Sequence, residues 1–124
     1  MPLESPDALE VRQIKGKGRG VFARRAIPAG TEFEKAPVLV VPTDTIDTSP
    51  LMDYVYCWGE ETVAVALGFG SMYNHSYEPN ARYDDVGRRT KVFTALRDIE
   101  PGEEITINYG GEPEARDDVG FEVK

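Results

Sequence analysis

The sequence predicts a mostly β fold from three features: short β-prone stretches, frequent turn residues between them, and few helical patterns. Apolar, aromatic or β-branched residues favour strands at 11–14, 21–23, 31–41, 51–58, 82–85, 89–95 and 105–109. The start of 51–58 is also compatible with a helix. Residues 60–69 alternate apolar and small side chains, which fits either a short strand or a tightly packed turn.

Glycine and proline residues separate these stretches. Three glycines within 15–20 allow a tight turn and a close approach of the backbone to a neighbour. Pro37 is expected to break the strand around it, because proline cannot donate a hydrogen bond to a neighbouring strand. Residues 68–81 are dense in Gly, Asn, Ser and Pro and are expected to form a structured loop. Residues 26–33 resemble 98–105, and both patterns indicate a turn that feeds a strand.

Length and charge limit the organisation and the partners of the protein. The 124 residues are expected to form one domain, because two halves would each be too small to bury a stable core. Asp and Glu number 22 against 14 Lys and Arg, which gives a net charge of −8. Such a surface repels nucleic acid and attracts basic proteins, although solubility alone also explains it. We therefore expect a basic protein partner and no direct contact with nucleic acid.

Cysteine content and hydropathy indicate the compartment. Cys57 is the only cysteine, so one chain cannot form an internal disulfide or a cysteine-rich zinc site. The first residues lack the basic and apolar pattern of a secretory signal, and no stretch is long enough to cross a membrane. A soluble intracellular protein without a metal ion is expected.

The most informative segment is the loop at 68–81. Asn74 offers an amide donor and acceptor, His75 has two ring nitrogens, and Pro79 stiffens the turn that leads to Asn80. Such a loop can hold a polar ligand. A lone histidine is more often a structural residue, and the Asn-His-Ser sequence also matches the glycosylation pattern, which would require secretion.

Three short motifs stand at separate places in the chain. Asn74-His75-Ser76 followed by Pro79-Asn80-Ala81 resembles the central motif of the SET-domain methyltransferase family. Residues 16–22 are similar to its Gly-x-Gly motif, and 103–109 resemble its acidic-to-tyrosine motif. The likeness covers about 11–109 and is strongest to short viral and bacterial SET proteins, which lack cysteine-rich flanks.

This resemblance implies a fold of small twisted sheets of the β-clip type with a carboxyl-terminal pseudoknot. Residues 103–109 would thread near 74–80, and 110–124 would form the tail of a single SET domain. The implied reaction moves a methyl group from S-adenosylmethionine to a lysine of a basic protein, such as a histone tail in chromatin, without a metal ion. The protein would be nuclear if eukaryotic or viral and cytoplasmic if bacterial.

The resemblance also assigns residues to the cofactor. They lie in the Gly-x-Gly motif, in or directly before the central motif, or in the tail, and they are Lys17, Gly18, Arg19, Met72, Tyr73, Asn74, His75 and Phe121. The backbone at 17–19 would pass the methionine part of the cofactor, residues 72–73 would lie along it, and Asn74 and His75 would bond to its amino group and adenine. Many relatives carry a zinc segment after the tyrosine that this chain lacks. Either Phe121 or a second copy of the chain, in a homodimer, is therefore expected to complete the site.

For catalysis the resemblance points to Tyr109, whose hydroxyl would orient the incoming amine. Tyr54 would line the lysine channel and assist, although packing in the core is an ordinary role for either tyrosine. Ile107 stands where relatives often carry a Phe or Tyr that limits the number of methyl groups, so an aliphatic residue predicts more than one round of methylation. The alternative hypotheses are a catalytically weak SET-like module that binds basic peptides and a structural β domain.

Overall fold

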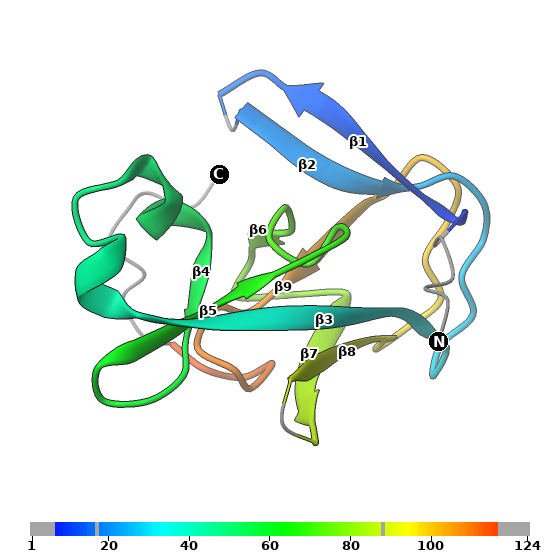
Figure 1. Ribbon diagram of the computed structural model, residues 1–124. Coiled ribbons are helices and arrows are strands. Elements are labelled where there is room, and N and C mark those ends of the chain that lie inside the picture. The colour runs from blue at the N-terminus through cyan, green and yellow to red at the C-terminus, as the bar shows by residue number, and fades with distance from the viewer. Residues whose placement is uncertain (1–6, 17, 88, 117–124) are drawn as a thin grey trace.

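The computed structural model describes residues 7–16, 18–87 and 89–116 (Figure 1). The strands in these ranges are β1 (Leu9–Ile14), β2 (Gly18–Ala23), β3 (Glu32–Pro42), β4 (Val55–Cys57), β5 (Thr62–Ala66), β6 (Asn74–His75), β7 (Ala81–Val86), β8 (Thr90–Ala95) and β9 (Glu104–Ile107). The 3-10 helices η1 (Thr43–Thr45) and η2 (Pro50–Tyr54) lie between β3 and β4. The described chain is therefore mostly β, which confirms the prediction.

The strands form two sheets (Figure 1). One sheet has the order β4-β5-β3-β8-β7, and the other has the order β1-β2-β9-β6. Neighbouring strands are antiparallel except β6 and β9, which run parallel. The long strand β3 pairs with β8 through its first half and with β5 through its second half, so it joins the two parts of the first sheet.

Pro37 does not end its strand, which corrects the prediction from the sequence. Strand β3 continues to Pro42. Pro37 is the last residue paired with β8, and Val38 is the first residue paired with β5. The Pro37 carbonyl accepts a hydrogen bond from the Leu67 N–H at 2.9 Å. The missing N–H of proline thus falls where the strand changes its partner, a position that tolerates the loss.

The ambiguous segments of the sequence take definite forms. Residues 51–58 begin in η2 and continue as β4, so the helical start and the strand are both present. The Ser49 hydroxyl caps η2 by accepting the Leu51 N–H at 3.1 Å. Residues 60–69 contain β5, which is the strand alternative. The loop at 68–81 contains the short strand β6.

The two similar turn segments pair with each other. Ile27 and Ile99 form an antiparallel bridge with N–H···O distances of 2.9 and 2.8 Å. Gly30 and Gly102 both have positive φ, at 83° and 84°, which glycine adopts without strain. The turns then lead into β3 and β9, as the sequence predicts. The bridge ties the β2–β3 connection to the β8–β9 connection.

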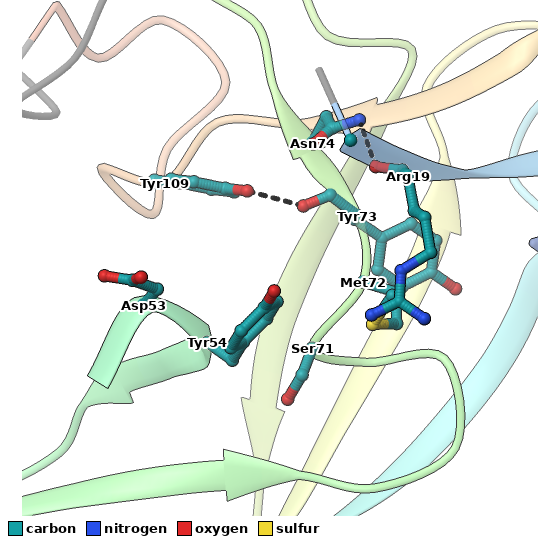
Figure 2. Close-up of a pocket in the computed structure, with 9 residues that line it drawn as sticks. Arg19, Asp53, Tyr54, Ser71, Met72, Tyr73, Asn74 and Tyr109 are labelled. Atoms are coloured by element: carbon teal, nitrogen blue, oxygen red, sulfur yellow. Dashed lines mark hydrogen bonds between the residues drawn. The ribbon is translucent and has the colours of Figure 1, made fainter. Parts of the chain in front are cut away.

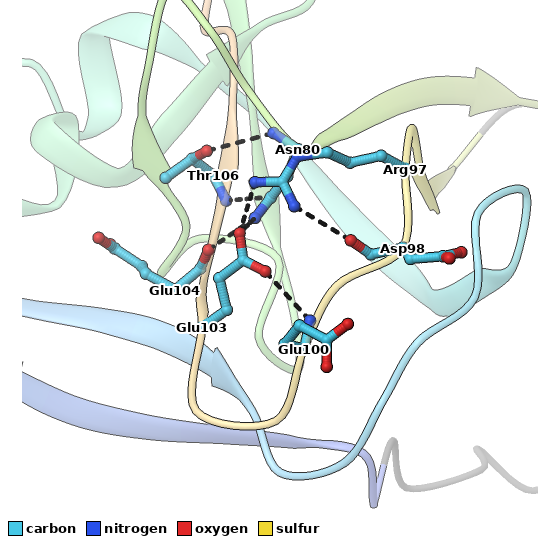
Figure 3. Close-up of polar contacts among 7 residues, drawn as sticks. All are labelled: Asn80, Arg97, Asp98, Glu100, Glu103, Glu104 and Thr106. Atoms are coloured by element: carbon cyan, nitrogen blue, oxygen red, sulfur yellow. Dashed lines mark hydrogen bonds and ion pairs between the residues drawn. The ribbon is translucent and has the colours of Figure 1, made fainter.

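Strand β9 passes beside the loop at 68–81, which we call the motif loop. This arrangement confirms the predicted threading. In the parallel pairing of β6 with β9, Asn74 lies opposite Thr106 and His75 lies opposite Ile107. Farther along the loop, the Asn80 side chain is 2% exposed. Its Oδ1 accepts the Thr106 N–H at 2.9 Å, and its Nδ2 donates to the Glu104 carbonyl at 2.8 Å (Figure 3). Residues 74–80 of the loop are thus fixed to β9 at both ends.

An ion pair braces the turn that leads into β9 (Figure 3). Arg97 contacts the Glu103 carboxylate, which also accepts the Glu100 N–H at 3.0 Å. The hydrogen bond from Arg97 is the main cause that lowers the pKa of Glu103 to about 2. The carboxylate therefore stays ionised across the ordinary pH range and keeps the turn fixed.

The core anchors the main chain of the motif loop through Tyr73. Its side chain is buried, and its ring lies 6.1 Å from Phe33 and 4.6 Å from Phe93, measured between centroids. The Tyr73 hydroxyl donates to Oε1 of Glu34 at 2.6 Å. Burial raises the pKa of Glu34. The hydrogen bonds that its carboxylate accepts from the Tyr73 hydroxyl and the Phe69 N–H partly offset this rise. A rigid aromatic cluster therefore holds the backbone of residue 73 in place.

Candidate active site

A pocket of about 280 Å³ lies between the start of β2, helix η2, the motif loop and the end of β9 (Figure 2). The residues that line it come from separate parts of the chain and are Gly18, Arg19, Asp53, Tyr54, Ser71, Met72, Tyr73, Asn74 and Tyr109. All of these except Asp53 and Ser71 are site residues predicted from the sequence. The fold therefore brings three distant motifs to one cavity.

The main chain of β2 forms one side of the pocket. Gly18 has a φ of +82°, and open space lies where a side chain would begin. The backbone is accessible there because glycine carries no Cβ. Asn74 donates through Nδ2 to the Arg19 carbonyl at 2.9 Å (Figure 2). The same Nδ2 also donates to Oε2 of Glu104 at 2.7 Å. Asn74 thus joins β2, β6 and β9 beside the pocket.

Tyr109 is held at its main chain and at its hydroxyl. Its N–H donates to Nδ1 of His75 at 2.9 Å, and its carbonyl accepts from the Tyr83 hydroxyl at 3.3 Å. Its own hydroxyl donates to the Tyr73 carbonyl at 2.6 Å, across the pocket wall (Figure 2). These contacts fix the position of the phenol relative to the motif loop.

The Tyr109 hydroxyl stays protonated at physiological pH. Burial raises its pKa to about 12, with further contributions from the charges of Glu104 and Tyr54. The hydroxyl is therefore a hydrogen-bond donor at physiological pH. The residue is nevertheless 39% exposed, so a group that enters from solvent can reach it.

Helix η2 supplies the opposite side of the pocket. Tyr54 is 42% exposed, and its ring lies with the Asp53 carboxylate across from Tyr109 (Figure 2). A carboxylate beside two phenols favours a cationic ligand over an anionic one. This side is therefore suited to an amine or ammonium group.

Two predicted site residues lie behind the pocket wall. Ile107 is 0% exposed within β9, and His75 is 3% exposed within β6. Burial lowers the pKa of His75, so its ring is neutral and can accept the Tyr109 N–H. Its Nε2 atom has no hydrogen-bond partner among the described residues. Lys17 and Phe121, which are also predicted cofactor residues, lie outside the described residues.

Three residues that support the pocket from behind were missed by sequence reasoning, namely Glu34, Tyr56 and Tyr83. Tyr83 holds the carbonyl of Tyr109, and the Tyr56 hydroxyl donates to the Gly70 carbonyl at 2.6 Å. Alternation of side chains along a strand could have shown that these tyrosines point inward. It could not have shown which main-chain groups they reach.

The segment after β9 folds back beside the motif loop. The buried Asn108 side chain donates to the carbonyls of Pro113 and Ala115, at 3.3 and 2.7 Å. Arg116 donates to the Tyr77 carbonyl at 2.9 Å, and its guanidinium lies 5.9 Å from the Tyr77 ring centroid. The beginning of the tail is thus attached to the loop by polar contacts.

Within the described ranges, no group of three or more His, Cys, Asp and Glu side chains is placed to hold a metal ion. A search of the same ranges for a helix long and apolar enough to span a membrane finds none. Cys57 is free and exposed.

The geometry defines a site that positions two reactants for group transfer. Open main chain of β2 and the motif loop can bind an extended ligand that has polar and apolar parts. The phenols and the carboxylate on the other side can bind an amine. The Tyr109 hydroxyl between them donates its proton to the Tyr73 carbonyl, so towards an amine N–H its oxygen can act as a hydrogen-bond acceptor. This is the arrangement expected of a transferase.

Comparison with known proteins identifies the family. Residues 18–110 match the SET domain family. The chain is 39% identical over 107 residues to a protein of Schizosaccharomyces pombe named histone-lysine N-methyltransferase, H3 lysine-37 specific, and the match covers 82% of this chain and 73% of that protein. A crystal structure from Plasmodium falciparum, described as a candidate histone methyltransferase, has a TM-score of 0.72 and 26% identity, covering 89% of this chain and 97% of that one.

The chain belongs to the SET-domain family of protein-lysine methyltransferases. This confirms the resemblance carried by the three motifs. The family uses S-adenosylmethionine as its methyl donor.

Proposed function

We propose that this chain is a histone-lysine N-methyltransferase that modifies histone H3 in the nucleus, with S-adenosylmethionine as the methyl donor. The observation that carries the proposal is the Tyr109 hydroxyl, held at the pocket by the Tyr73 carbonyl at 2.6 Å. The 39% identity to an H3 lysine-37 methyltransferase supports histone H3 as the substrate. Residues 1–124 would act as one SET domain, with 110–124 as its tail.

The pocket residues fit S-adenosylmethionine without a metal ion. Gly18 leaves main chain open, Met72 offers an apolar side, and Asn74 fixes the polar end of the pocket. The residues that would hold the cofactor are Lys17, Gly18, Arg19, Met72, Tyr73, Asn74 and Phe121. The buried His75 would support them from behind the pocket wall, through its hydrogen bond with the Tyr109 N–H. When bound, S-adenosylmethionine supplies an activated methyl group on a positively charged sulfur. The Asp53 carboxylate at the pocket favours such a charge.

Gly20→Ala is expected to weaken cofactor binding about tenfold, the loss that corresponds to about one hydrogen bond. A Cβ at residue 20 would lie 2.6 Å from Oε2 of Glu104, 2.7 Å from Cδ1 of Ile14 and 2.8 Å from Nδ2 of Asn74. The side chains would have to move apart, so Asn74 would lose its contacts with β2 and β9. Calorimetric titration with S-adenosylmethionine measures the change in affinity.

Gly30→Ala is the matched control for that substitution. Gly30 has a φ of +83° and nothing within 4 Å of its would-be Cβ. Alanine there strains the backbone and lowers stability without touching the pocket. Equal cofactor affinity of the wild type and the Gly20→Ala variant would contradict the role given to the Asn74 junction.

The proposed catalytic step depends on placement of the substrate lysine by Tyr109. A lysine amine has a pKa of about 10.4 in water, so it has to release a proton before its lone pair can attack a methyl group. Loss of water in a narrow channel and the positive charge of the bound cofactor both disfavour the ammonium form, so they would lower that pKa. Tyr54 and Tyr109 are 42% and 39% exposed, so the released proton can pass to water at the channel mouth. The Tyr109 hydroxyl then orients the neutral amine.

Charge and assembly complete the proposal. The net charge of −8 favours a basic partner such as a histone tail. Asp53 lies at the pocket and adds a carboxylate where a basic tail would enter. A second copy of the chain remains the alternative to Phe121 as the wall that completes the channel. Direct binding of nucleic acid is not part of the proposal.

The test is a methyl-transfer assay with labelled S-adenosylmethionine and each of the four recombinant core histones. We expect label on histone H3, and a loss of that label when H3 lysine-37 is replaced by alanine. Mass spectrometry should find products beyond monomethyl-lysine, because the aliphatic Ile107 has no hydroxyl that could hold a water molecule or the amine. Labelling of another histone alone would contradict the substrate, and only monomethyl product at long times would contradict the role of Ile107.

The methyl-transfer assay together with calorimetry separates the proposed enzyme from the catalytically weak alternative. A module that binds basic peptides without turnover would bind S-adenosylmethionine and an H3 peptide in calorimetry and still give no labelled product. A purely structural domain would bind neither. An active enzyme has to bind both and release methylated H3.

A further inference from the structure

Strand β8 carries a fully buried lysine in the core near the pocket. Lys91 is 1% exposed, and its neighbours Val92 and Phe93 are also buried. Its ammonium Nζ lies 2.6 Å from Oδ1 of Asp85, which faces it directly in the pairing of β7 with β8. Lysine is almost never fully buried unless its charge is paired. The position therefore requires a specific environment.

Three aromatic rings complete that environment. The Lys91 Nζ lies 4.2 Å from the ring centroid of Tyr56, 4.4 Å from that of Tyr83 and 5.6 Å from that of Trp58. Tyr56 and Tyr83 meet edge to face, with centroids 5.1 Å apart. Ring faces attract a cation most strongly where water is excluded. We call these three rings and Asp85 the Lys91 cage.

The cage is connected to the pocket by the hydroxyls of its tyrosines. The Tyr83 hydroxyl donates to the Tyr109 carbonyl at 3.3 Å, and the Tyr56 hydroxyl donates to the Gly70 carbonyl at 2.6 Å. Gly70 immediately precedes the loop residues that line the pocket. None of the cage residues lines the pocket itself. The rings that surround the ammonium are thus the same rings that fix the main chain on two sides of the pocket.

We propose that Lys91 is a positioning residue, whose ammonium holds the Tyr56 and Tyr83 rings so that their hydroxyls fix the main chain at Gly70 and Tyr109. The proposal rests on the proposed role of Tyr109. Stability alone does not explain the cage, because the Asp85 side chain is 49% exposed and an ion pair with a partner in solvent contributes little to stability. A cation attracted to ring faces, in contrast, fixes the orientation of those rings.

The first test is Lys91→Met, which keeps most of the volume and removes the charge. We expect kcat for methyl transfer to fall about tenfold while KM for S-adenosylmethionine changes less than about twofold, since placement affects the reacting amine. The thermal midpoint should stay near that of the wild type. Lys35→Met is the matched control, because Lys35 is exposed on β3 opposite Val92 of β8. It should leave kcat unchanged.

A double-mutant cycle tests the route through Tyr83. Tyr83→Phe removes the hydroxyl that reaches Tyr109 and keeps the ring of the cage. Because both changes release the same contact, the double variant Lys91→Met/Tyr83→Phe should lose much less than the product of the two single losses. If the kcat loss of the double variant equalled the product of the two single losses, the route from Lys91 through Tyr83 would be overturned.

Chemical rescue tests the cage directly. In Lys91→Ala the cage is vacated, and added n-propylammonium should restore kcat in a saturable manner. The neutral molecule 1-propanol should not. Rescue by both molecules equally would mean that the site needs volume rather than charge and would overturn the proposal. Lys91→Met with the kcat of the wild type would do the same.

One readout needs no methyl transfer and separates this proposal from the proposed function. The Tyr109 N–H is hydrogen-bonded to His75, so its hydrogen exchange reports how firmly that main chain is held. It should exchange faster in Lys91→Met than in Lys35→Met at equal global stability. Inactivity of the wild type would defeat the proposed function but leave this result interpretable. Unchanged exchange in Lys91→Met would defeat the positioning role.

Discussion

Replacing Tyr109 by phenylalanine is expected to lower the rate of methyl transfer about a hundredfold or more, since a placement error near 1 Å can already cost that much. The substitution removes the hydroxyl that reaches the Tyr73 carbonyl at 2.6 Å. The main-chain contacts with His75 and Tyr83 remain, so the backbone should keep its position. We therefore expect a folded protein with nearly normal cofactor affinity and a low kcat, measured in single-turnover assays with histone H3.

The control for this substitution is Tyr77→Phe. Tyr77 packs against His75 with ring centroids 4.4 Å apart and does not line the pocket. Loss of its hydroxyl should leave kcat near that of the wild type. A Tyr109→Phe variant with full activity would show that the hydroxyl is dispensable. Loss of cofactor affinity in parallel with kcat would instead make Tyr109 part of the cofactor wall.

The sequence predicts those features of the fold that depend on local patterns and on the motifs. The strand at 105–109 follows from alternating apolar residues, and Ile105 and Ile107 are indeed both 0% exposed. The resemblance to the family also implies that β9 threads beside the loop, which the parallel pairing with β6 confirms. Six pocket residues lie in or directly before the same motifs, because each motif contributes a turn or strand end to one cavity, and Tyr54 was predicted separately from the resemblance to the family.

Features that depend on pairing between distant strands are not visible in the sequence. Pro37 is locally a strand breaker, and its tolerance depends on β3 changing partners at that residue. Lys91 carries no local sign that it is buried, since an alternating strand presents a lysine to solvent as readily as to the core. Its burial depends on Tyr83 from the neighbouring strand β7 and on Tyr56 from β4, which β5 and β3 separate from β8 in the sheet.

Replacing Asn80 by alanine is expected to lower the free energy of unfolding by about 2–5 kcal/mol, because two main-chain groups would lose their partner in a buried place. Asn80 is 2% exposed and bonds through one side chain to the Thr106 N–H and the Glu104 carbonyl (Figure 3). A loss of that size is a large part of the about 5–15 kcal/mol that stabilises a typical domain. Urea unfolding followed by circular dichroism measures it.

Thr106→Val separates the side-chain contacts of Asn80 from its main-chain contact at the place where the motif loop crosses β9. The Thr106 hydroxyl accepts only a long hydrogen bond of 3.4 Å from the Asn80 N–H, so its removal should cost less than about 1 kcal/mol. If both variants lost equal stability, the side-chain amide of Asn80 would not be what holds the crossing. If Asn80→Ala is the far larger loss, it should also impair cofactor binding, since the loop it releases carries Asn74 and continues from Met72 and Tyr73. The threaded crossing would then support both the fold and the site, because the same loop that passes beside β9 forms one wall of the pocket.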